Sequence, residues 1–370
     1  MLLGAPASRN GGQRPARLWW LWLWVALVSS SVFSSSSSAA GSRRASSEGQ
    51  QQHHQESSFE CPGELGIAIN SGDGRLDTGL FSLGNLGWAG SLVAAEKMSS
   101  KNLVVYSSVR RGSMPLRDGN VPITPCCGGR DLSKNIRDAQ RMREYTFSKM
   151  LDYFPSTTQW FLSTEEDVWW DVEGLCRIIE DTVAYAGIDD SKTPVLMGGG
   201  VKRVFGPFVV VNRPMLELFA NDTLFDACKH YISVPGNNPA GDRVYPGAAY
   251  NNDHLVNYCA LTYFPAKTGV QVYSNISQSM WRPDYFFANS GNWHKSSRAP
   301  CYVEHLPKGK PVAFHHATVD DMVFLQRRLE TIKRGQDFVV PPDELAHCSP
   351  DFKVQLFGDL NETERHDLVF

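Results

Sequence analysis

Three consecutive carboxylates follow a short apolar stretch near the middle of the chain. Residues 160–164 read Trp-Phe-Leu-Ser-Thr, and Glu165, Glu166 and Asp167 come directly after them. Adjacent carboxylates repel one another, so they are tolerated in solvent or around a cation and are costly elsewhere. Hard divalent ions such as Mg2+ and Mn2+ take oxygen ligands, commonly one or two carboxylates together with substrate phosphates. The pattern indicates either a metal site that holds a diphosphate or a charged turn that favours the N-terminus of the next helix.

Three residues elsewhere in the sequence are suited to related chemistry. Arg75 ends the turn 72–75, which follows the first predicted strand. Asp253 precedes an apolar, helix-like run, where an aspartate is a good N-cap. His315 ends the apolar segment 311–314. A histidine at the end of a strand is either a metal ligand or a surface residue with ordinary hydrogen bonds.

Alternating strands and helices are predicted to position these residues. Such an order is typical of an α/β fold, with a mostly parallel sheet and helices on both faces. Ligands of these sheets bind at the carboxyl ends of the strands, where the acidic run is predicted to lie. Residues 111–131 are rich in Gly, Pro and Arg and predict a long loop, and 335–370 predict an irregular tail. The predicted strands are 65–71, 102–108, the segment around Trp160, 193–200 and 311–317, and the predicted helices are 86–97, 131–153, 172–186, 215–219 and 320–334.

The N-terminal region predicts delivery to the secretory lumen. Residues 1–17 are basic and predict a cytoplasmic tail, and 18–33 form an apolar, tryptophan-rich run that predicts a signal anchor. This run is short for a membrane span, and small residues follow it at 38–41, so a cleaved signal peptide is the alternative. Residues 34–57 are rich in Ser and Gln and predict a flexible stem. The folded domain is expected at 58–370.

Composition agrees with a lumenal, sugar-bearing protein. The chain has eight cysteines, which indicate disulfides in an oxidising compartment, with a pairing that the sequence leaves open. Glycosylation acceptor triplets begin at Asn221, Asn275 and Asn361. The formal charge is −3 and the basic residues form no dense stripe, so we expect no nucleic-acid partner.

Taken in order, these motifs resemble the Fringe-like branch of the β-1,3-glycosyltransferases, glycosyltransferase family 31, which includes Fringe and the core 1 β-1,3-galactosyltransferase. The resemblance extends over residues 66–329 and is strongest over 150–175, where a helix, a Phe-Pro turn, Trp-Phe and the acidic triplet follow one another. It implies a GT-A (Rossmann-like) fold and an inverting enzyme that takes a UDP-sugar and Mn2+. The acceptor would be a glycan or glycoprotein hydroxyl. A Golgi or endoplasmic reticulum type II membrane protein is expected, and a homodimer stays open.

The resemblance also implies roles for single residues. The last residue of the triplet, Asp167, would bind Mn2+ together with His315. Glu165 and Glu166 would contact the donor, and Arg75, in the basic loop after the first strand, would contact the uridine diphosphate. Asp253 corresponds to the family's catalytic base, which would take the proton of the attacking hydroxyl.

The chain departs from the family pattern at three places. The usual all-Asp triplet is replaced by Glu165-Glu166-Asp167, and the usual Gly-Gly-Ala-Gly motif is reduced to Phe-Gly-Pro-Phe at 205–208. The acidic pair that precedes the helix with the catalytic base has become Asn252-Asp253. Two rival hypotheses therefore remain. One is a non-catalytic lumenal chaperone or glycan-binding relative, and the other is a glycoside hydrolase that uses Glu165 or Glu166 with Asp253 and no metal. Binding of Mn2+ and UDP separates the transferase from both.

Overall fold

Residues Ser58–Phe370 form one compact unit, and every residue described below belongs to it. The computed structural model describes residues 61, 64–71, 99–107, 112–116, 119–126, 136–165, 168–198, 209–234, 237, 252–275, 285–289, 299–305, 310–315, 317–346 and 348. Within these ranges, no helix is both long enough and apolar enough to span a membrane. The predicted tail, anchor and stem lie outside them.

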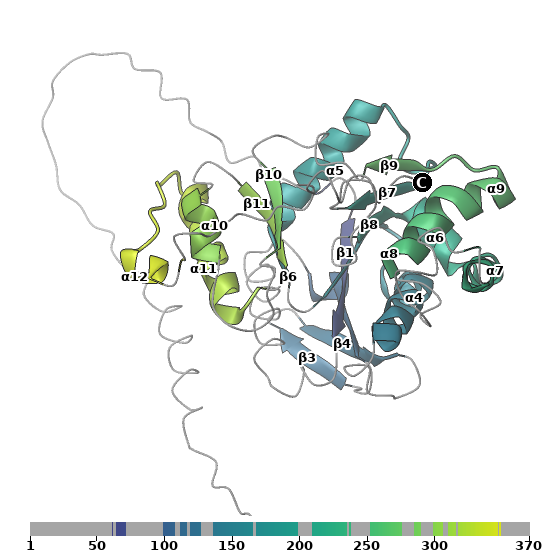
Figure 1. Ribbon diagram of the computed structural model, residues 1–370, viewed down its shortest axis with the longest axis horizontal. Helices are drawn as coiled ribbons and strands as arrows, with labels where there is room; N and C mark the ends of the chain where they lie inside the picture. The colour runs from purple at the N-terminus through teal and green to yellow at the C-terminus, as the bar shows by residue number, and fades with distance from the viewer. Residues whose placement is uncertain are drawn as a thin grey trace, which may run out of the picture. The chain divides into compact units, whose positions relative to one another are not determined.

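An eight-stranded, mostly parallel sheet forms the centre of this unit (Figure 1). Its strand order is β3-β4-β2-β1-β5-β8-β7-β9, and only β3 and β8 run against the other strands. This confirms the predicted α/β class with a mostly parallel sheet. The strands are β1 (Glu64–Ser71), β2 (Leu103–Ser107), β3 (Gly112–Leu116), β4 (Gly119–Pro125), β5 (Thr158–Glu165), β7 (Val195–Gly198), β8 (Val209–Asn212) and β9 (Tyr273–Asn275).

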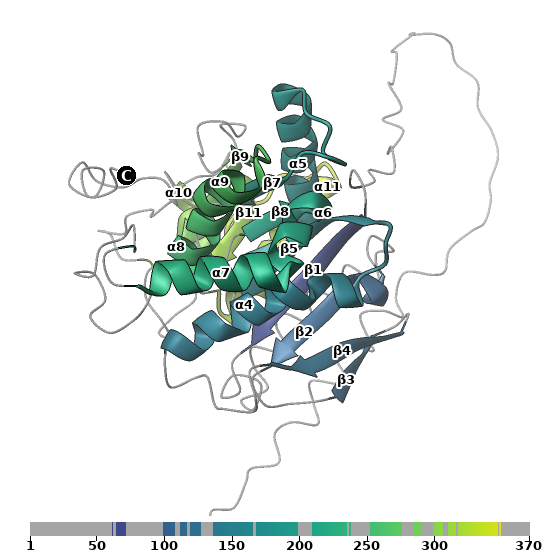
Figure 2. The same cartoon turned by 90° about the vertical axis from the view of Figure 1, so that its right-hand side faces the viewer.

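Helices cover one face of the central sheet (Figure 2). Alternate strand residues such as Ala68, Val104 and Phe161 point to this face and pack with aromatic side chains of the helices. Phe219 contacts the rings of Phe147, 5.0 Å away between centroids, and of Phe225 and Phe264. The helices are α4 (Ile136–Tyr153), α6 (Arg213–Ala220), α7 (Asp222–Ser233), α8 (Asn252–Tyr258), the π-helical turn Cys259–Tyr263 and α9 (Phe264–Thr268).

A second, smaller sheet covers the other face together with further helices. Its order is β10-β11-β6, with β10 (Tyr285–Asn289) parallel and β6 (Val168–Trp170) antiparallel to β11 (Lys310–His315). The other alternate residues of the central strands, including Ile67, Val105 and Leu162, pack against it. Both faces of the central strands are thus buried, which explains their nearly continuous apolar sequences. The helices on this side are α5 (Val172–Ala186), α10 (Ala299–His305), α11 (Val319–Lys333) and α12 (Pro342–Leu345).

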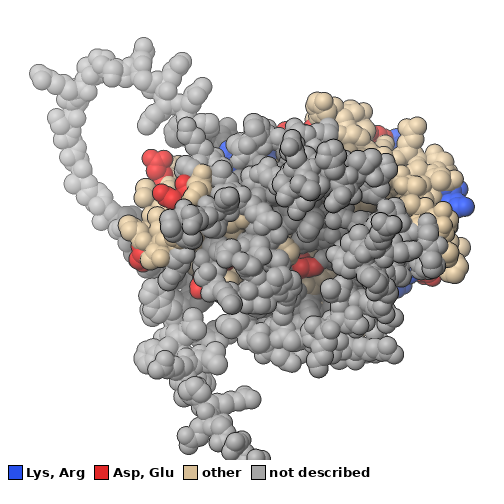
Figure 3. Space-filling model, in the orientation of Figure 1, with Lys and Arg blue, Asp and Glu red and all other residues tan. Residues whose placement is uncertain are grey.

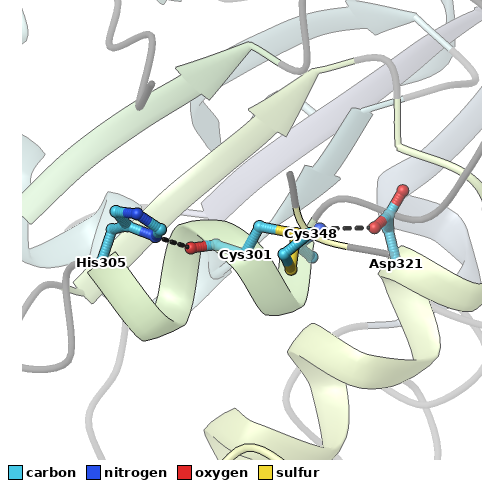
Figure 4. The surroundings of a disulfide bond; sticks show 5 residues. Cys301, His305, Asp321 and Cys348 are labelled. Carbon is cyan, nitrogen blue, oxygen red and sulfur yellow. Dashed lines mark hydrogen bonds between the residues drawn. A yellow bond between two sulfur atoms is a disulfide. The ribbon is translucent and has the colours of Figure 1, made fainter. Parts of the chain in front are cut away.

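Among the described residues, three disulfides tie segments that are distant in sequence, which confirms the prediction of disulfide bonding. They join Cys61 to Cys176, Cys228 to Cys259 and Cys301 to Cys348. The last of these lies beside the fully buried carboxylate of Asp321 (Figure 4). Asp321 accepts hydrogen bonds from the backbone N–H of Ala299 at 2.7 Å and of Thr318 at 2.9 Å. The carboxylate therefore holds the starts of α10 and α11 together.

The short helix α12 is fixed to α11 by charge. Arg327 of α11 pairs with Glu344 of α12, and its guanidinium lies over the rings of Phe324 and Phe338. Figure 3 shows acidic side chains over the part of the unit where Figure 1 labels these two helices. The predicted irregular tail thus contains one ordered turn of helix.

Most predicted elements that lie within the described ranges are present, and some predictions were wrong. Helix 172–186 has the predicted bounds, and the first strand begins one residue earlier than predicted. Residues 111–131 are not one long loop, because they contain the paired strands β3 and β4. Helices do not cover both faces alone, since β6, β10 and β11 share one of them. The predicted helix 86–97 lies outside the described residues.

Candidate metal centre

Parallel strands β1, β2 and β5 end at one edge of the central sheet. Asn70, the penultimate residue of β1, is the register partner of Tyr106 near the end of β2 and of Glu165 at the end of β5. In open α/β sheets this edge is where ligands bind. Glu165 therefore lies where the sequence predicted the acidic run to be.

The small sheet brings His315 to the same place. Strand β6 begins at Val168, directly after Asp167 in the chain, and pairs antiparallel with the end of β11. In this register His315 is opposite Val168. The pairing of two short strands thus places the predicted histidine ligand opposite the first residue of β6.

Glu165 and His315 are in contact. The distance from Glu165 Oε2 to His315 Nε2 is 3.4 Å. The histidine side chain is only 8% exposed, whereas that of Glu165 is 25% exposed. His315 is therefore buried, whereas Glu165 is partly exposed to solvent.

A buried polar network fixes the backbone that leads to Glu165. The side-chain amide of Asn70 donates to Ser163 Oγ at 3.0 Å and to the carbonyl of Thr164 at 3.1 Å. Its carbonyl oxygen accepts from the hydroxyl of Thr146, on α4, at 2.5 Å. All four residues are buried. Since each hydrogen bond in such a network restricts the groups it joins, the end of β5 is held from two sides.

A second contact joins the end of β5 to β6. The indole N–H of Trp170 donates to Thr164 Oγ1 at 2.9 Å, and both side chains are buried. Thr164 is the penultimate residue of β5, and Trp170 is the last residue of β6. Because β6 pairs with the end of β11, the hydrogen bond ties the end of β5 to the strand pair that contains His315.

Asp171, which directly follows β6, is a further buried carboxylate. It is 8% exposed, and its Oδ1 has no hydrogen-bond partner among the described residues. Burial raises the pKa of its carboxyl, and the charge of Lys333 opposes that rise. Its backbone N–H donates to the carbonyl of Val312 at 2.8 Å. Asp171 therefore connects the start of α5 to β11.

The Glu165–His315 pair fits a divalent transition metal. Carboxylate oxygens suit Mg2+ and Mn2+, whereas an imidazole nitrogen favours transition metals, so Mn2+ meets both preferences. In the described part of the chain, no group of three or more His, Cys, Asp or Glu residues is placed to hold a metal. Glu166 and Asp167 lie outside this part. The pair alone supplies two ligands, and such ions commonly complete their shell with phosphate and water.

The other predicted site residues are only partly placed. Asp253 is the second residue of α8, which confirms its predicted position at the start of a helix. Its carboxylate, and the whole of Arg75, Glu166 and Asp167, lie outside what the structure describes. Asn70, Thr164 and Trp170 were not predicted from the sequence to be parts of the site. A polar residue at the end of each apolar strand was the signal that could have indicated Asn70 and Thr164.

Comparisons with known proteins leave the family open. No protein-family model matches the chain, and no curated protein matches it in sequence. A solved structure similar to it is that of a glycosyltransferase involved in the glycosylation of the major capsid of PBCV-1. The two share 14% identity over 71% of this chain and 99% of that chain, with a TM-score of 0.36. This likeness is too low to carry an argument, so the function is argued from the residues of the site.

Proposed function

We propose that the protein is an inverting, Mn2+-dependent glycosyltransferase that moves a sugar from a UDP-sugar to a hydroxyl of a glycan or glycoprotein. The observation that carries this proposal is the contact between Glu165 and His315 at the ligand-binding edge of a mostly parallel sheet. It joins two residues to which one family resemblance assigned donor binding and metal binding.

In this proposal, Asp167 and His315 hold Mn2+, which would neutralise the charge that develops on the departing UDP. Glu166 and Arg75 contact the donor. Asp253, at the start of α8, takes the proton from the acceptor hydroxyl while the hydroxyl oxygen attacks the anomeric carbon from the face opposite UDP. The resemblance to the Fringe-like enzymes supports these roles and a β-1,3 linkage.

The proposed place of action is the Golgi or endoplasmic reticulum membrane, with residues 58–370 in the lumen. The three disulfides support an oxidising compartment. The first acceptor triplet begins at the exposed Asn221, which caps α7. Residues 18–33 would form the type II signal anchor.

Donor turnover tests this proposal. The purified full chain is incubated with UDP-galactose, UDP-N-acetylglucosamine or UDP-glucose, with Mn2+ or with a chelator, and released UDP is measured. We expect Mn2+-dependent release from at least one donor and a loss of about a hundredfold or more in Asp253→Asn. A chain that binds Mn2+ and UDP but releases no UDP with any donor and a panel of glycan acceptors would favour the non-catalytic relative.

A further inference from the structure

We propose that Glu165, the first residue of the acidic triplet, binds the same metal ion as His315. This inference rests on the proposed function and sharpens it. The family resemblance assigns the metal to Asp167 and His315 and gives Glu165 a donor contact only. The geometry instead points to Glu165 as a direct ligand.

The separation of the two side chains is compatible with a shared cation and is longer than a direct hydrogen bond. A charge-assisted N–H···O hydrogen bond is about 2.7–2.9 Å long, whereas Glu165 Oε2 and His315 Nε2 are 3.4 Å apart. Two ligands that each lie about 2.1 Å from one octahedral ion, at right angles, are separated by roughly 3.0 Å. A shift of a few tenths of an ångström would therefore bring both atoms to bonding distance.

The length of the glutamate side chain explains its presence at this position. Glu165 is the last residue of β5, and its backbone is fixed by the hydrogen bonds of Asn70 and Thr164. An aspartate there would end about 1.5 Å shorter, the length of one C–C bond. Its carboxylate would then fall short of His315. The departure from the usual all-Asp triplet thus gains a physical reason.

Charge and burial favour the same assignment. His315 is buried, so its position is fixed by the surrounding core, and a neutral imidazole is the form that binds metals. Glu165 is followed directly by Glu166 and Asp167. A divalent cation at Glu165 would relieve the repulsion among three successive carboxylates.

Binding of Mn2+ alone to the full chain tests the inference. Free aqueous Mn2+ has a strong electron paramagnetic resonance signal that weakens on binding, so titration gives a dissociation constant without any turnover. We expect Glu165→Gln and Glu165→Asp each to weaken binding at least tenfold, the first by loss of charge and the second by loss of reach. Glu64→Gln, the same change at the opposite end of the strand pair, is the matched control and should bind as the unmodified chain does.

The outcomes separate this inference from the function on which it rests. If a folded Glu165→Gln or Glu165→Asp binds Mn2+ within twofold of the unmodified chain, while Asp167→Asn loses binding, Glu165 is no ligand and the proposed function stands. If the unmodified chain binds no Mn2+ even with UDP present, both fail. Thermal unfolding of each variant shows whether it is folded, and Glu165→Asp keeps the charge in case Glu165→Gln does not fold.

Discussion

Two glutamates stand at opposite ends of the same pair of parallel strands. Glu64 begins β1 and pairs in register with the start of β5, whereas Glu165 ends β5 opposite Asn70 near the end of β1. The two side chains are similarly exposed, 33% for Glu64 and 25% for Glu165. Their surroundings differ, and this difference separates the part of the sheet that holds the fold from the part that we propose to bind a ligand.

Glu64 is bound by its own neighbours. It pairs with Lys101 at 3.1 Å and accepts hydrogen bonds from the hydroxyls of Thr157 at 2.5 Å and Thr158 at 3.4 Å. These contacts, the Thr157 hydroxyl first, lower the pKa of the Glu64 carboxyl. At this end of the sheet, the Glu64 carboxylate is therefore paired with an ammonium group and two hydroxyls of the protein itself.

Glu165 faces a buried imidazole and stands before two more carboxylates. The hydrogen bonds around it join backbone and side chains of Asn70, Thr164 and Trp170, and they fix the chain that carries it. The network therefore determines where the carboxylate lies. The comparison teaches that residue type alone does not identify a site, so the proposed site rests on the held backbone beside a buried histidine.

The largest effect is expected from His315→Ala. Loss of a metal ligand should lower Mn2+-dependent UDP release by about a hundredfold or more, because affinity falls together with charge stabilisation. The unfolding temperature should change far less than the activity. Activity and thermal unfolding are measured on the same preparation of the variant to compare the two. Equal losses of folded protein and activity would mean that His315 is only a core residue.

Gly66→Ala probes the structural end of the same strand. A Cβ atom at this position would lie 2.9 Å from Cδ1 of the buried Phe154 ring. We expect a loss of about 1–3 kcal/mol in unfolding free energy from overpacking. Urea denaturation measures this loss. Mn2+ affinity of the folded variant should stay within twofold, and a tenfold change would contradict the separation of the two ends.

Thr164→Val should affect both stability and the site. The change keeps the side-chain shape and removes the oxygen that accepts from the Trp170 indole, at a cost of about 1–2 kcal/mol. Mn2+ affinity should fall severalfold because the end of β5, which carries Glu165, loses its hydrogen bond to β6. Thr164→Ser restores the hydroxyl and should recover the affinity. A fall in stability with unchanged affinity would limit the role of Thr164 to folding.

The smallest effect is expected from Glu64→Gln, and it depends on pH. Because folding lowers the pKa of Glu64, the group stabilises the folded state at pH values above the ordinary pKa of 4.5, and this stabilisation is lost as the pH falls below it. Thermal unfolding should show a deficit of about 0.5–1 kcal/mol at pH 7 that shrinks as the pH falls from 4.5 through the lowered pKa of Glu64. A deficit that grows on acidification would contradict this sign.

Most of the elements could be predicted from the sequence, but their contacts could not. Apolar runs that end in polar residues predicted β1, β5 and β11, and with them the positions of Glu165 and His315. Strand β6 has three residues, too few for a periodic pattern, yet its pairing with β11 brings the two residues together. The bond between Asn70 and Thr146 depends on how α4 packs on the sheet, which no local pattern encodes.

Strands β3 and β4 were missed for a different reason. Their sequences contain Gly, Pro and Asn, which are depleted in strands, and the antiparallel pairing of the two segments overrides that preference. The disulfide pairing was also beyond the sequence. Cys61 and Cys176, for example, meet only because the segment before β1 reaches α5.

Calorimetric titration of the full chain with UDP, with and without Mn2+, tests the central claim most directly. We predict binding that requires Mn2+, that Asp167→Ala abolishes and that Glu64→Gln leaves unchanged. Such a result would establish a metal-dependent nucleotide site at the end of β5 that is distinct from the opposite end of the strands. UDP binding that is absent from the folded protein in both conditions, or that is indifferent to Mn2+ and to Asp167, would contradict the account.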